Sequence, residues 1–146
     1  MKNFVFLGLA AGLMSCTSSP SIDEEIVNLR TETIAVHDEI MPQISDFDRK
    51  GIQIDELLTK LDSLKKLQVD LDTSALHVEL RHVKGRLEGA TDAMNQWMID
   101  FNADSISQTK EDVRQYYQNE LEKVQAMKRT FEEVTKESTD KLARFQ

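Results

Sequence analysis

Apolar residues recur every three or four positions over most of this chain, which is the spacing of an amphipathic helix. The first such stretch predicts a long helix over 22–66, and Ser21 and Glu24 fit a capping box at its start. We expect a kink near Pro42, with a break over 42–51 as the alternative, because proline removes a backbone donor. The apolar or small positions are Ile22, Ile26, Leu29, Thr33, Val36, Ile40, Ile44, Phe47, Ile54, Leu57, Leu61 and Leu64.

Two further helices are predicted in the rest of the chain. One follows the candidate caps Asp72, Thr73 and Ser74, and the other follows Ser105 and Gln108, a second candidate capping pair. The first has an unbroken stripe at Leu76, Leu80, Val83, Leu87, Ala90, Met94, Trp97 and Phe101. The second has its stripe at Val113, Tyr117, Leu121, Val124, Met127, Phe131, Val134, Ser138, Leu142 and Phe145.

Short connections between long helices decide how these stripes are buried. Loops of about 4–8 residues place consecutive helices side by side and antiparallel. The predicted fold is therefore all-α, an elongated antiparallel three-helix bundle of coiled-coil character whose first helix is kinked near Pro42. The register that follows, good to about one turn, places Met41 near Met98 and His37 near Phe101 and Asn102. It also places Met94 level with Tyr116 and Tyr117.

The N-terminus has the composition of a secretory signal. Lys2 precedes an apolar run over Phe4–Met14, which is too short for a membrane span of about 20 residues. Leu13-Met14-Ser15-Cys16 resembles the lipobox of bacterial lipoproteins, although Met14 is unusual at its position. The resemblance implies a cleaved signal over 1–15, acylation of Cys16, a tether over 16–20 and a helical domain over 21–146. It also implies a lipid anchor in the cell envelope, and Thr17, in place of aspartate, favours the outer membrane.

Composition and motifs argue against several functions. The 26 acidic residues outnumber 18 basic ones, so binding to nucleic acid is not expected. The single cysteine allows no internal disulfide. The sequence contains no phosphate-binding glycine loop, no His-Glu-x-x-His motif and no Gly-x-Ser-x-Gly motif. We therefore predict a protein without catalytic residues and without a cofactor.

The register gathers the unusual side chains in one slab near Pro42. This slab consists of His37, Met41, Met94, Trp97, Met98, Tyr116 and Tyr117. The favoured interpretation is core packing, since methionine fills the irregular space that a kink leaves. The alternative is a Cu(I) or Ag(I) site in which His37, Met41, Met94 and Met98 are the ligands and Trp97 lies beside them. An apolar ligand held in a cavity of the slab is a third hypothesis.

Two other patterns bear on partners. Gly85, Gly89 and Ala93 form a stripe of small residues on the second helix, which favours contact with the third helix or, as the alternative, docking of a partner protein. Residues 22–48 carry eight acids against Arg30 alone, which indicates a solvated acidic face. We expect a structural or protein-binding role.

The body of the chain has a further resemblance. The stretch His37-Asp38-Glu39-Ile40-Met41-Pro42, with Met94, Trp97, Met98 and Phe101 downstream, is similar to small bacterial lipoproteins labelled "viral A-type inclusion protein". That label reflects generic coiled-coil similarity. The resemblance supports a lipidated helical protein and implies no mechanism.

Overall fold

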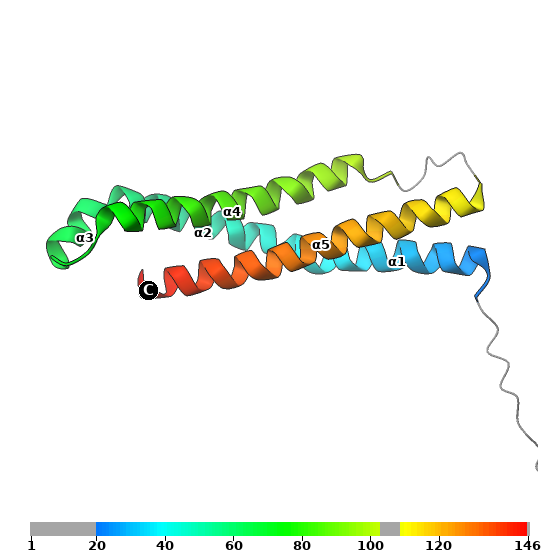
Figure 1. The fold of residues 1–146 in the computed structure, drawn as a ribbon, viewed down its shortest axis with the longest axis horizontal. Coiled ribbons are helices and arrows are strands. Elements are labelled where there is room, and N and C mark those ends of the chain that lie inside the picture. Colours follow the sequence, from blue (N-terminus) through cyan, green and yellow to red (C-terminus); the bar gives the residue numbers. More distant parts are fainter. Residues whose placement is uncertain (1–19, 103–108, 146) are drawn as a thin grey trace, which may run out of the picture.

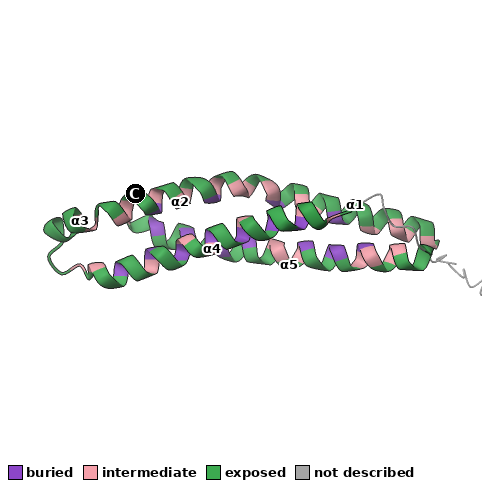
Figure 2. Ribbon diagram, turned by 90° about the horizontal axis from the view of Figure 1, so that it is seen from above, coloured by how far each residue is buried: buried purple, intermediate pink, exposed green. Residues whose placement is uncertain are grey.

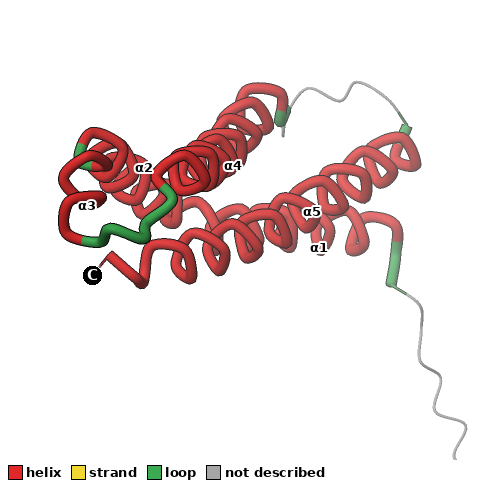
Figure 3. The backbone as a smooth tube through the Cα atoms, turned by 60° about the vertical axis from the view of Figure 1, so that its left-hand side comes forward, coloured by secondary structure: helices red, strands yellow, loops and turns green. Residues whose placement is uncertain are grey.

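The computed structural model describes residues 20–102 and 109–145, and the elements within them are helical (Figure 3). The prediction of an all-α fold is confirmed. The elements are α1 (Ile22–Ile40), a 3-10 turn (Met41–Gln43), α2 (Ile44–Thr59), α3 (Leu61–Leu67), α4 (Thr73–Asp100), α5 (Lys110–Leu142) and a second 3-10 turn (Ala143–Phe145). The predicted signal segment 1–15, Cys16 and the tether up to residue 19 lie outside the described residues.

The first predicted helix is interrupted where proline was expected to disturb it. Pro42 lies in the 3-10 turn between α1 and α2, because a proline nitrogen has no hydrogen to donate to the preceding turn. A further break at Lys60 separates α2 from α3. Gly51, the last residue of the stretch 42–51 in which a break was the alternative, lies inside α2 without interrupting it. One glycine costs a helix only about 1 kcal/mol, so the packing of α2 overrides it.

The helix starts test the predicted caps. Ser21 Oγ accepts from the backbone N–H of Glu24 at 3.3 Å, and Glu24 returns the bond to Ser21, as predicted. Asp72 caps α4 by accepting from the N–H groups of the two residues that follow Thr73.

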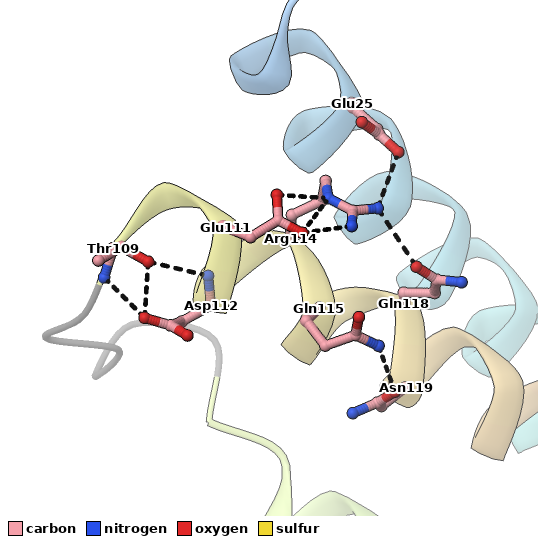
Figure 4. Close-up of polar contacts among 8 residues, drawn as sticks. All are labelled: Glu25, Thr109, Glu111, Asp112, Arg114, Gln115, Gln118 and Asn119. Atoms are coloured by element: carbon pink, nitrogen blue, oxygen red, sulfur yellow. Dashed lines mark hydrogen bonds and ion pairs between the residues drawn. The ribbon is translucent and has the colours of Figure 1, made fainter.

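The cap of the third long helix differs from the prediction. The predicted pair, Ser105 and Gln108, lies outside the described residues. The cap of α5 is instead a box formed by Thr109 and Asp112 (Figure 4). Asp112 stands where a capping box usually has Glu or Gln, so the pair lacks the usual sequence pattern of this motif.

The helices form an elongated rod (Figure 1), in which α1 and α2 follow one another along one edge (Figure 2). Along its length α1 packs on α5, α2 packs on α4, and α4 packs on α5. At one end α1 and α5 extend past the last turn of α4 (Figure 1). Adjacent segments of the chain run antiparallel, and α1 therefore lies parallel to α5.

Ion pairs follow the parallel α1–α5 contact and explain the acidic first segment. Asp23 bonds Lys110 at 2.6 Å, and Glu39 bonds Lys128 at 2.6 Å, sixteen residues further along α1 and eighteen along α5. Between them Arg114 contacts Glu25 (Figure 4). The acidic face that we expected to be solvated is thus partly paired with α5. Each exposed pair adds only about 0–1 kcal/mol, but together they favour one register.

The core is one narrow line of apolar side chains along the rod, seen as the buried faces in Figure 2. Phe47 and Phe131 join α2 to α5 with ring centroids 4.9 Å apart. Two hydroxyls predicted within the stripes, Thr33 and Ser138, are fully buried and donate to carbonyls of their own helices. They enter the core because this internal bond satisfies the hydroxyl.

The register expected across the two turns is only half correct. His37 lies against Trp97, one turn from the predicted Phe101, which is within the stated uncertainty. Met94, however, is not level with Tyr116 and Tyr117, because both tyrosines lie beside Phe101 instead. Since α5 begins only at Lys110, the second connection is longer than assumed and shifts α5 by about two turns.

Candidate functional site

Three helices meet around Trp97, and this junction is the candidate site. The indole of Trp97, on the last turn of α4, has its ring centroid 5.4 Å from that of His37 on α1 and 4.7 Å from that of Phe101. Phe101 then contacts Tyr116 and Tyr117 of α5. The aromatic residues of the predicted slab are therefore together, with Phe101 as the residue that connects them.

The polar edge of Trp97 is held by a buried carboxylate. Trp97 Nε1 donates to Glu120 Oε2 at 2.9 Å, and Glu120 is only 5 % exposed. Lys123 Nζ, on the same helix, donates to the other carboxylate oxygen at 2.7 Å. This hydrogen bond raises the pKa of Lys123. Both oxygens of the buried acid thus have donors, which offsets the cost of removing it from water.

Sequence reasoning missed Glu120. It lies three residues after Tyr117 and four before Val124, so its spacing places it beside the buried stripe of α5. Two features of the sequence could have indicated its burial: its spacing from the apolar stripe, and a tryptophan on the neighbouring helix. A buried indole N–H needs an acceptor, which Glu120 can supply.

His37 is partnered on one nitrogen only. Its Nδ1 lies 2.9 Å from Asp38 Oδ1, and the imidazole side chain is 20 % exposed. Within the described part of the chain, Nε2 is buried and has no hydrogen-bond partner. Because a carboxylate accepts and does not donate, Nδ1 carries the proton in this hydrogen bond, and in the neutral imidazole Nε2 then presents a lone pair.

The three methionines of the slab differ in their surroundings. Met94 is fully buried within the apolar core, whereas Met41 and Met98 are half-buried at its edge. The packing interpretation therefore describes Met94, and the two half-buried thioethers remain candidates for another role. Among the described residues, no group of three or more His, Cys, Asp or Glu side chains could hold a metal ion.

A groove between α2 and α4 is a second feature of the surface. Phe47 and Leu87 contribute its apolar part, and Gly51 leaves space in it, since nothing lies within 4 Å of where its Cβ would be. The rim is charged, with Lys84 bonded to Asp55 at 2.6 Å across the groove. This hydrogen bond raises the pKa of Lys84. The remaining lining residues are Asp48, Ile52, Glu88, Thr91 and Asp92, so acids outnumber bases around it.

The small-residue stripe of α4 lies beside this groove and not against α5. Gly85, Gly89 and Ala93 are exposed, and nothing lies within 4 Å of a Cβ built on either glycine. Our preferred explanation of the stripe, close contact with the third helix, is therefore wrong. Buried residues such as Leu80, Leu87 and Met94 form the opposite face of α4. Close packing within this chain therefore does not explain why glycine stands at these two positions.

Replacing Gly85 or Gly89 by alanine will stabilise the protein by about 0.5–1 kcal/mol each. The reason is that alanine favours the helix, and its methyl group meets no neighbour. The measurement is the free energy of unfolding in denaturant, followed by helical ellipticity. Ala93→Gly is the matched control and should lower stability by a similar amount. Destabilisation by either glycine replacement would mean that α4 is closely covered there.

Comparisons with known proteins give no assignment. No protein-family model matches this chain, and no curated protein or solved structure matches it either. Within residues 20–102 and 109–145, none of the helices combines the length and apolar character needed to cross a membrane.

Proposed function

We propose that this chain is a lipid-anchored protein of the bacterial envelope, attached to the outer membrane through Cys16, whose helical rod binds a partner protein and has no catalytic role. The lipobox-like run ending at Cys16 supports the anchor. Several acyl chains, each contributing about 0.8 kcal/mol per buried CH₂, would hold the protein at a membrane without a spanning helix.

The groove between α2 and α4 carries the binding part of the proposal. An apolar floor with charged edges is the usual arrangement of a surface that receives an amphipathic helix. The acidic edge, which includes Asp48 and Asp92, favours a partner helix with basic residues. Gly85 and Gly89 directly follow the lining residues Lys84 and Glu88 along α4, and both are exposed with open space around them, so they would let a backbone approach closely. Ile52 at the rim is 61 % exposed and gives such a partner an apolar contact.

The anchor is tested with Cys16→Ser in cells supplied with a labelled fatty acid. We expect the wild-type chain to carry the label and to fractionate with the outer membrane. We expect the variant to lose both properties, whereas Ser19→Ala, a matched change beside the anchor, should keep them. Equal labelling of Cys16→Ser and wild type would disprove the anchor.

The binding surface is tested by a photo-crosslinking residue placed at Ile52, with one at exposed Arg129 on α5 as control. We expect a discrete adduct from position 52 alone. Changing Asp48 and Asp92 to lysine should weaken it strongly, and Asp140→Lys, a matched reversal on α5, should not. No adduct, or adducts equal at both positions, would contradict a docking role for the groove.

A further inference from the structure

We propose that His37, Met41 and Met98 form a binding site for a monovalent soft metal ion, Cu(I) or Ag(I), between α1 and α4. This inference goes beyond the docking role and does not depend on it, because the site lies at the Trp97 junction and not in the α2–α4 groove.

The imidazole of His37 is already arranged as a metal ligand. Metal-binding histidines usually donate their second ring N–H to a carboxylate or carbonyl, which fixes the tautomer and strengthens the ligating nitrogen. Here Asp38 receives Nδ1–H at 2.9 Å, and Nε2 is the buried atom that has no partner among the described residues. A lone pair buried without a donor is costly in a folded protein. A bound metal ion would remove that cost.

Met41 follows His37 by one helical turn on the same side of α1. The backbone N–H of Met41 donates to the carbonyl of His37, so the two side chains are stacked neighbours. His37 points toward α4, as its contact with Trp97 shows. The half-buried thioether of Met41 therefore lies at the edge of the same interface.

Met98 belongs to the facing side of α4. Leu87 and Thr91 of α4 line the groove shared with α2, so that side of the helix faces the α1–α2 arm. Met98 comes seven residues after Thr91 and eleven after Leu87, spacings that return a helix to nearly the same direction. Met98 thus faces α1 and α2 from the turn that carries Trp97.

The donor set determines which ion would bind. Two thioethers and one imidazole are soft, uncharged ligands that select Cu(I) or Ag(I) over hard divalent ions. Met94, which we had included among the ligands, is fully buried in the core and is left out. The indole of Trp97 beside His37 supplies a reporter, since it is the chain's one tryptophan.

The experiment is a titration of the full chain, purified in detergent, with Ag(I) and then with Cu(I) held by a competing chelator. Cys16→Ser is the background for all variants, because any chain that escaped acylation would have a free Cys16 thiol, which binds both ions. We expect saturable quenching of Trp97 fluorescence at one equivalent. Met41→Leu, Met98→Leu and His37→Gln should each weaken binding by more than about tenfold, and Asp38→Ala by about 10–100-fold.

Two methionine variants control for general effects of losing sulfur. Met94→Leu beside the site and Met127→Leu on α5 should leave the affinity unchanged. Helical ellipticity, measured for each variant, shows that the fold is retained. Quenching without saturation, or equal affinity in Met98→Leu and Met127→Leu, would overturn the proposal.

Discussion

Replacing Phe131 by alanine will lower the free energy of unfolding by about 3–5 kcal/mol, the largest loss that we expect from any single substitution. Phe131 is 1 % exposed, and its ring packs 4.9 Å from that of Phe47, which is 2 % exposed. This pair lies where α2 follows the proline turn and must be held against α5. Removing the Phe131 ring leaves a cavity, and because the rod has a single narrow core, no second layer of side chains can move in to fill it.

The measurement for Phe131→Ala is equilibrium unfolding in denaturant, with Val27→Ala as control. Val27 is 60 % exposed on α1, and its truncation should change stability by less than about 0.5 kcal/mol. A loss below about 1 kcal/mol for Phe131→Ala would contradict tight packing of the two rings.

The second large effect is expected at the buried pair of Trp97 and Glu120. Trp97→Phe and Glu120→Met should each cost about 1–3 kcal/mol, because each leaves a buried polar group without its partner. The double variant should lose much less than the sum, since neither group then remains. Glu120→Gln should be the mildest change, because its amide oxygen still accepts from the indole.

A double-mutant cycle followed by ellipticity measures this coupling. We expect a coupling energy of about 1 kcal/mol or more between Trp97 and Glu120. The control cycle pairs Trp97→Phe with Glu122→Met, a change at an exposed acid on the same helix, and should give additive effects. Additivity in both cycles would show that the hydrogen bond contributes nothing to stability.

The candidate site was predictable only in part. The sequence brought His37 close to the end of α4, and the structure confirms this neighbourhood through Trp97. It did not identify Phe101 as the residue that joins the tyrosines to Trp97, because the length of the second connection controls that contact. The sequence also could not distinguish the fully buried methionine from the half-buried ones. Met94 is fully buried and Met98 only partly, although the two side chains, four residues apart, differ in direction by only about 40° around α4.

The stripe of α4 shows most clearly what periodicity determines. Leu76, Leu80 and Leu87 were expected to face inward, and all three are buried. Spacing alone suffices there, because a helix turns by a fixed angle per residue and water drives the apolar side inward. The capping boxes and the break at Pro42 are equally local, since each depends on atoms within four residues.

The all-α class, the approximate extent of the three helical stretches and the buried stripe of each were thus determined by the sequence itself. The tertiary structure alone decided the pairing of α1 with α5, the burial of Glu120 and the exposure of Gly85 and Gly89. These features depend on how far one helix slides along another and how it is rotated about its axis. That choice is made by the sum of many weak contacts between residues distant in the sequence, which no local pattern records.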